Sequence, residues 1–177
     1  MSLGLGSLRV LLADDNPHMR SIVMTLLQSF GVREPLEAGD GGEALGLLAN
    51  RAVDLAIIDF KMAPMDGVEF TRRVRHAPDS RDPYLPIIMM TGHSGKARVE
   101  QARDAGVTEF IVKPLTARTL LHRIHAVIYK PRPFIQTPTY FGPDRRRRDD
   151  AAYAGPGRRA GDQGARPAPQ DNASLMI

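Results

Sequence analysis

The chain has 177 residues, 42% of them apolar, a net charge of +4 and no cysteine. This length accommodates one domain of ordinary size and a tail, and the lack of thiols excludes disulfides and thiolate metal sites. No stretch approaches the ~20 apolar residues of a membrane span, and residues 1–7 lack the charged and apolar regions of a secretory signal. We therefore expect a cytoplasmic protein without membrane contact.

The positive charge is concentrated near the end of the chain. Residues 131–177 hold eight arginines and five aspartates, which accounts for three of the four net positive charges. The basic balance is thus largely a property of this segment, and we do not expect the preceding part of the chain to bind nucleic acid.

Residues 8–130 alternate short apolar runs with helix-length segments, which is typical of βαβ units. The expected strands cover residues 8–13, 34–38, 53–58, 86–90 and 108–112. The expected helices cover residues 17–30, 43–50, 67–76, 95–105 and a last segment that begins after Thr116. Five strands and five helices in strict alternation predict an α/β fold, with one parallel sheet between two helical layers.

The chain is expected to divide into a short lead (residues 1–7), a folded domain (8–130) and a tail (131–177). The tail is rich in Pro, Arg and Gly and has little to bury, so we expect it to be largely disordered. Residues 134–141 are more apolar than a typical linker. They could dock on the domain or on a partner, and the sequence leaves both interpretations open.

Five polar residues stand at the ends of the expected strands. Asp14 and Asp15 follow the first strand, Asp59 the third, Thr91 the fourth and Lys113 the fifth. Each residue type alone is common in loops and turns. Ligands of an open α/β sheet sit at the carboxyl ends of its strands, so the five together predict one site.

The types of these residues suit phosphoryl transfer. Mg²⁺ prefers oxygen ligands and is usually held by one or two carboxylates plus a phosphate oxygen. The carboxylate of Asp59 is a competent nucleophile toward phosphorus. The ammonium group of Lys113 is a compact cation for a phosphoryl oxygen, and the hydroxyl group of Thr91 can donate a hydrogen bond.

Residues 8 to about 130 resemble a receiver domain of the CheY-like response-regulator family. The matching segments are Leu11–Asn16, Asp59–Gly67, Met90–Gly92 and Phe110–Pro114. The resemblance implies a flavodoxin-like (βα)5 three-layer sandwich with a five-stranded parallel sheet of order 2-1-3-4-5.

The resemblance also implies roles for the site residues. Asp59 would be the phosphoacceptor. Asp14, Asp15 and Asp59 would bind Mg²⁺ or Mn²⁺ together with the backbone carbonyl group of Lys61, and Asp15 would be a direct ligand. Thr91 would contact the phosphoryl group.

Three further roles concern the bound phosphate, the response to phosphorylation and its duration. Lys113 would pair with the phosphate, while Thr91 and Phe110 would be the switch residues; Phe110 is equally well interpreted as an ordinary buried aromatic residue of a strand. Lys61 and His93 occupy the positions that tune the phosphoryl lifetime in the family, although they also read as two exposed polar residues.

Together these features predict a stand-alone response regulator that accepts a phosphoryl group from a histidine kinase or phosphotransfer protein. We expect its output to be protein–protein contact through the face formed by the fourth helix, fifth strand and fifth helix, and we do not expect a turnover enzyme. Two alternatives stay open. The protein could bind nucleic acid or a scaffold through the tail with its arginine run 145–148, or it could be a phosphate sink in a relay.

Overall fold

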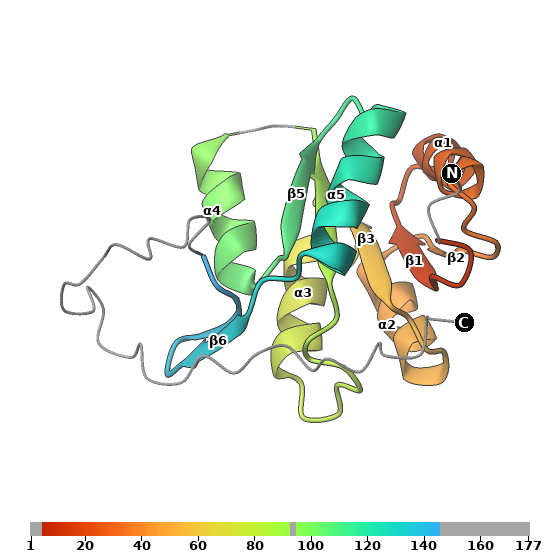
Figure 1. The fold of residues 1–177 in the computed structure, drawn as a ribbon. Coiled ribbons are helices and arrows are strands. Elements are labelled where there is room, and N and C mark those ends of the chain that lie inside the picture. The colour runs from red at the N-terminus through yellow and green to blue at the C-terminus, as the bar shows by residue number, and fades with distance from the viewer. Residues whose placement is uncertain (1–4, 93–94, 146–177) are drawn as a thin grey trace, which may run out of the picture.

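The computed structural model describes residues 5–92 and 95–145, and residues 1–4, 93–94 and 146–177 lie outside the described part. Figure 1 shows a twisted sheet between helices. The helices are α1 (Pro17–Ser29), α2 (Gly41–Asn50), α3 (Gly67–His76), α4 (Lys96–Ala105) and α5 (Ala117–Tyr129). The strands are β1 (Val10–Ala13), β2 (Leu36–Ala38), β3 (Leu55–Asp59), β4 (Ile87–Thr91), β5 (Glu109–Val112), β6 (Phe134–Thr137) and β7 (Tyr140–Pro143).

The five strands β1 to β5 form one sheet in the order β2-β1-β3-β4-β5, and every neighbouring pair is parallel. This confirms the predicted fold class and strand order. Strand β1 lies inside the sheet, between β2 and β3. The chain therefore reverses its direction of progress across the sheet after β2, and the carboxyl ends of β1 and β3 lie next to each other.

The two faces of the sheet bury separate cores, because successive side chains of a strand point to opposite faces. Leu11 and Ala13 of β1 belong to the core beneath α2, α3 and α4. Val10 and Leu12 of the same strand belong to the core beneath α1 and α5. Every residue of β1, β3 and β4 is buried, as expected for parallel strands covered on both faces.

Capping residues set the starts of the helices. The side chain of Asn16 accepts hydrogen bonds from the backbone N–H groups of His18 and Met19 and so caps the start of α1. Helix α2 begins two residues earlier than predicted, since Asp40 accepts from the N–H groups of Gly42 and Glu43 and so caps the helix before the two glycines.

The segment after α5 contains a feature beyond the predicted domain boundary at residue 130. Strands β6 and β7 pair antiparallel as a hairpin, which lies beside the lower ends of α3 and α4 in Figure 1. Phe134 and Tyr140 are buried. The apolar stretch 134–141 thus packs on the domain, whereas most of the tail predicted to be disordered (146–177) lies outside the described residues. Within the described part, no helix is long and apolar enough to cross a membrane.

An ion pair at the start of β1 supplies a test of surface electrostatics. Arg9 donates to the carboxylate of Asp54 from Nε at 2.9 Å and from Nη2 at 2.6 Å, and its backbone N–H group donates at 2.9 Å. Burial alone would raise the pKa of Asp54, but the side-chain hydrogen bond, the backbone hydrogen bond and the charge of Arg9 together lower it. The carboxylate is therefore more stable in the folded than in the unfolded chain.

Replacing Arg9 with alanine is expected to lower the free energy of unfolding by about 0.5–1 kcal/mol at pH 7, because the pair is half-exposed. A lowered carboxyl pKa stabilises the folded state above the unfolded pKa, and the effect is lost as the pH falls through the folded value. The difference between the two proteins should therefore shrink below about pH 4. Urea unfolding at a series of pH values measures it, and Arg9→Lys, which keeps the charge but not the two-pronged geometry, should restore part of the loss.

Candidate phosphoryl-transfer site

The sheet brings the predicted polar residues together at the carboxyl ends of its strands. Asp14 directly follows β1, Asp59 and Thr91 are the last residues of β3 and β4, and Lys113 directly follows β5. Asp14, Asp59 and Thr91 are buried, with 1%, 6% and 1% of their surface exposed, whereas Asp15 is exposed. Buried carboxylates are costly unless they are paired, so their partners decide how the site is held together.

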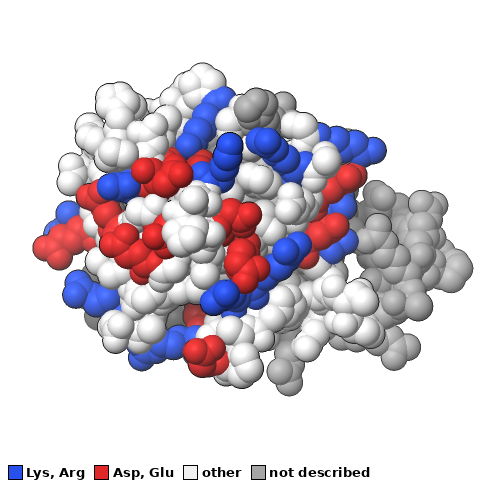
Figure 2. Space-filling model, turned by 180° about the vertical axis from the view of Figure 1, so that it is seen from behind, with Lys and Arg blue, Asp and Glu red and all other residues white. Residues whose placement is uncertain are grey.

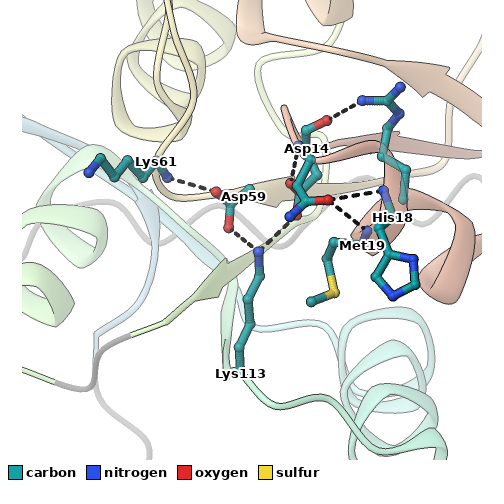
Figure 3. A network of polar contacts seen from close by, with 8 residues as sticks. Asp14, His18, Met19, Asp59, Lys61 and Lys113 are labelled. Carbon is teal, nitrogen blue, oxygen red and sulfur yellow. Dashed lines mark hydrogen bonds and ion pairs between the residues drawn. The ribbon is translucent and has the colours of Figure 1, made fainter.

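Lys113 is the partner of both buried aspartates. Figure 3 shows its side chain reaching up between them: Nζ lies 2.8 Å from Oδ2 of Asp14 and 2.7 Å from Oδ1 of Asp59. The backbone N–H group of Lys61 donates to the other oxygen of Asp59 at 3.0 Å. The backbone N–H group of Asn16 donates to Oδ1 of Asp14 at 2.9 Å. Each of the two carboxylates thus binds the lysine through one oxygen and a backbone N–H group through the other.

The buried charges shift the pKa values of the pair. Burial raises the pKa of Asp59; the hydrogen bond and charge of Lys113 oppose this, the charge of Asp14 adds to it, and the pKa remains above its ordinary value. Burial lowers the pKa of Lys113, but hydrogen bonds to Asp14 and Asp59 and the charges of both outweigh it and raise the pKa. Lys113 is consequently held in its charged form between the carboxylates.

The same carboxylates form a cluster that could hold a metal ion. One oxygen from each of Asp14, Asp15 and Asp59 lies within 4.8 Å of the others. Three carboxylates offer the hard oxygen donors that Mg²⁺ prefers, and the exposed position of Asp15 leaves room for the waters that Mg²⁺ usually keeps. The donor set therefore fits this ion.

Two contacts that the sequence analysis did not identify hold the backbone of Asp14 and Asp59 in place. Nη1 of Arg20, one turn into α1, donates to the backbone carbonyl oxygen of Asp14 at 2.7 Å. At β3, the start of α3 approaches so closely that a Cβ atom on Gly67 would overlap the backbone oxygen of Asp59 and would lie 3.2 Å from Cγ2 of Ile58. The glycine of the Asp59–Gly67 segment was the only sequence signal for the second contact, and the arginine gave none.

The remaining predicted residues are less closely joined to the acidic cluster. Phe110 is half-buried in β5 and packs against the core beneath α2, α3 and α4. Lys61 is exposed, and its side chain extends away from the cluster in Figure 3. Only its backbone N–H group contacts Asp59 among the contacts described above. His93 lies outside the described residues.

Comparisons with known proteins agree with this geometry. Residues 10–125 match the response regulator receiver domain family. The chain is 34% identical over 120 residues to the chemotaxis protein CheY of Pseudomonas aeruginosa, covering 68% of this chain and 95% of the relative. It is 38% identical over 122 residues to the chemotaxis protein CheY1 of Helicobacter pylori, covering 68% and 97%.

A solved structure supports the same assignment. The chemotaxis protein CheY4 of Vibrio cholerae superposes with a TM-score of 0.62 at 31% identity, covering 68% of this chain and 98% of that chain. Proteins with this domain take part in two-component signalling and generally bind Mg²⁺. The match covers most of both cores and all five site residues at the strand ends, and it ends before the hairpin; the chain therefore belongs to the response regulator receiver domain family.

Proposed function

We propose that this protein is a stand-alone response regulator whose phosphoacceptor is Asp59, and that a histidine kinase or histidine phosphotransfer protein supplies the phosphoryl group. The observation that carries the proposal is the arrangement of Asp14, Asp15, Asp59 and Lys113 at one edge of the sheet. It combines a carboxylate nucleophile, donors for a divalent cation and a fixed positive charge. The protein acts as a signalling domain rather than a turnover enzyme.

The proposed transfer forms one bond and breaks one bond. A carboxylate oxygen of Asp59 attacks the phosphorus atom of a phosphohistidine, the new P–O bond forms, and the departing imidazole nitrogen keeps the electron pair of the P–N bond. Lys113 neutralises charge on the phosphoryl oxygens, and the hydroxyl group of Thr91 donates to one of them. The three carboxylates and the backbone carbonyl group of Lys61 would hold Mg²⁺, which supplies further positive charge.

The signal is proposed to leave through the face formed by α4, β5 and α5. Thr91 ends β4, and the chain leads from there directly to α4, so a displacement of Thr91 toward the phosphoryl group would act on this helix. Val99 of α4 and Val112 of β5 are 36% and 44% exposed. Exposed apolar side chains on this face suit a protein partner, and Phe110 is proposed to respond together with Thr91.

Lys61 and His93 are proposed to tune the lifetime of the phosphoryl group. Lys61 is exposed two residues beyond Asp59, where its charge can act on a water molecule or a kinase histidine that approaches the phosphorus. Dephosphorylation rates of Lys61→Ala and His93→Ala that equal the wild-type rate would dispose of this role.

The nucleic-acid alternative gains little support from the face shown in Figure 2. Figure 2 shows Lys and Arg interspersed with Asp and Glu on the face turned away in Figure 1, without an uninterrupted basic area. Of the arginine run, the described Arg145 pairs with Asp104 at 3.2 Å. Deleting residues 146–177 separates the alternatives: partner binding that survives and still depends on Asp59 favours the α4–β5–α5 face over the tail. Rapid return of the phosphoryl group to a kinase without any phosphorylation-dependent partner would favour the phosphate sink.

The decisive experiment is phosphorylation by a small acyl phosphate, followed by intact mass. The wild-type protein should gain one phosphoryl group only when Mg²⁺ is present, and removal of Mg²⁺ by a chelator should abolish the gain. Asp59→Asn should gain none, because an amide oxygen is a far poorer nucleophile than a carboxylate. Asp54→Asn, which removes a carboxylate at the other end of β3, serves as the matched control and should be phosphorylated like the wild type. Equal uptake by Asp59→Asn would refute the assignment of the phosphoacceptor.

A further inference from the structure

The hairpin of β6 and β7 lies at the end of the sheet opposite the acidic cluster. It contacts the carboxyl ends of α3 and α4, the ring of Tyr84 in the loop before β4 and, through Arg132, the carbonyl oxygen of Thr108 just before β5, whereas the acidic cluster lies at the carboxyl ends of the strands. It also lies beyond residue 125, where the match to the receiver family ends. The hairpin is thus an addition that the receiver function of this chain does not by itself explain.

The hairpin is tightly packed against the end of α4. A Cβ atom on Gly142 of β7 would lie 2.8 Å from Cα of Gly106, the residue that ends α4 with a φ of 97°. In the other direction, a Cβ atom on Gly106 would lie 2.8 Å from the backbone oxygen of Phe141. Two backbones meet here without intervening side chains, so even one added methyl group would force them apart.

Aromatic rings and a buried arginine extend this contact to α3 and the loop before β4. The rings of Tyr84, Phe134 and Phe141 pack together with centroids 5.1 to 5.6 Å apart. Arg75 of α3 is only 3% exposed; its guanidinium group lies 5.0 Å from the Phe134 ring. Nε of Arg75 donates to the carbonyl oxygen of Gly106 at 3.0 Å. One side chain therefore links α3, the end of α4 and the hairpin.

Charged side chains fasten both ends of the hairpin. Arg132, before β6, donates to the backbone carbonyl oxygens of Thr108 and Asp144. Arg145, after β7, pairs with Asp104 of α4 at 3.2 Å and lies 3.9 Å above the ring of Tyr140. The docking is therefore specific to one place on α3, α4 and β5.

Helix α4 packs on α3 as well as on the hairpin, and its first half buries no residue. Its buried residues are Ala102 and Ala105, both in the second half of the helix, and its N-cap Gly95 offers no side-chain hydrogen bond. In the first half, Arg98 lies 5.6 Å from the ring of Phe60, the residue that follows Asp59. Helix α4 thus joins the hairpin at one end to the neighbourhood of the phosphoacceptor at the other.

We infer that the hairpin, residues 131–145, is a regulatory clamp that holds α4 in the arrangement of the unphosphorylated protein. This inference rests on the proposed phosphorylation of Asp59. A clamp that favours one of two positions of α4 must oppose whatever favours the other. By reciprocity, occupation of the phosphoryl site weakens the docking of the hairpin, and release of the hairpin strengthens binding at the phosphoryl site by the same factor.

The test compares two glycine substitutions in the full-length chain. Gly142→Ala places a methyl group against Gly106 and against the hydroxyl oxygen of Tyr140, 2.6 Å away, and so should undock the hairpin. Gly46→Ala is the matched control, because a Cβ atom there meets nothing within 4 Å. Calorimetric titration with beryllium fluoride, a phosphoryl mimic, at saturating Mg²⁺ should show at least about threefold tighter binding to Gly142→Ala than to the wild type and Gly46→Ala.

Hydrogen exchange of the wild-type protein tests the reciprocal effect without any substitution. The amides of residues 131–145 should exchange at least about threefold faster with beryllium fluoride bound than without it, and Asp59→Asn should show no change. If the wild type bound beryllium fluoride and hydrogen exchange of the hairpin stayed unchanged, the clamp alone would be overturned. The same would follow if Gly142→Ala folded and bound beryllium fluoride with the wild-type affinity. Failure of the wild type to bind beryllium fluoride at all would overturn the proposed function as well.

Discussion

Replacing Lys113 with alanine is expected to slow phosphoryl uptake from a small acyl phosphate about 100-fold, the usual effect of removing one preorganised charged or hydrogen-bonding group from a site of developing charge. Lys113 is also the cation that binds both Asp14 and Asp59. Without it, the charge of Asp14 acts on Asp59 unopposed and raises the pKa of Asp59 further.

The same substitution should strengthen Mg²⁺ binding, by at least about threefold, because it removes a positive charge in direct contact with two of the three carboxylates. Opposite effects on the phosphorylation rate and on the metal affinity distinguish loss of one charge from general damage to the site. Intact mass over time gives the rate, and calorimetric titration gives the affinity. Lys130→Ala, which removes an exposed lysine at the end of α5, should change neither quantity. A Lys113→Ala rate within about threefold of the wild-type rate would contradict the role of Lys113.

Replacing Gly67 with alanine is expected to lower the free energy of unfolding by about 3 kcal/mol, the upper part of the usual range for overpacking. The added methyl group would overlap the backbone oxygen of Asp59 and press on Ile58. Backbone atoms of a central strand cannot move aside as the end of a flexible side chain can. Either α3 shifts away from β3, or β3 shifts and displaces the phosphoacceptor.

Urea unfolding measures the loss, and Gly46→Ala again provides the matched control. Gly46 lies within α2 with open space around it, so alanine should leave stability unchanged or raise it by up to about 1 kcal/mol through its better helix propensity. If Gly67→Ala were as stable as the wild type, the close approach of α3 to β3 would be refuted. If Gly67→Ala folds with reduced stability, it should also accept the phosphoryl group more slowly, because the position of Asp59 depends on the same contact.

The succession of strands and helices along the chain was predictable from hydrophobic periodicity alone. Buried parallel strands appear as short apolar runs, and here each run ends at a polar residue that marks the carboxyl edge of the sheet. That pattern located Asp14, Asp59, Thr91 and Lys113 before any geometry was known. It could not give the contacts among them: that one lysine bridges two carboxylates depends on the spacing of β1, β3 and β5 in three dimensions.

The hairpin was harder to predict, for a physical reason. Two four-residue strands separated by Pro138 and Thr139 are too short to be stable alone, and prolines nearby suggest irregular structure. Their stability comes from packing on α3 and α4, which no local pattern reveals. Arg75 illustrates the same point, since an arginine in a charged helix reads as solvent-exposed, yet the hairpin covers it.

The two edge strands of the sheet bear on how the protein behaves at high concentration. Strand β2 has three residues and β5 has four. Each includes a glutamate, Glu37 in β2 and Glu109 in β5. Open edges are where sheets of separate molecules join and aggregate, and short, charged edge strands oppose this. The apolar segments 55–58 of β3 and 87–90 of β4 lie inside the sheet, so the sequences most prone to form intermolecular β-structure become available only when the domain unfolds.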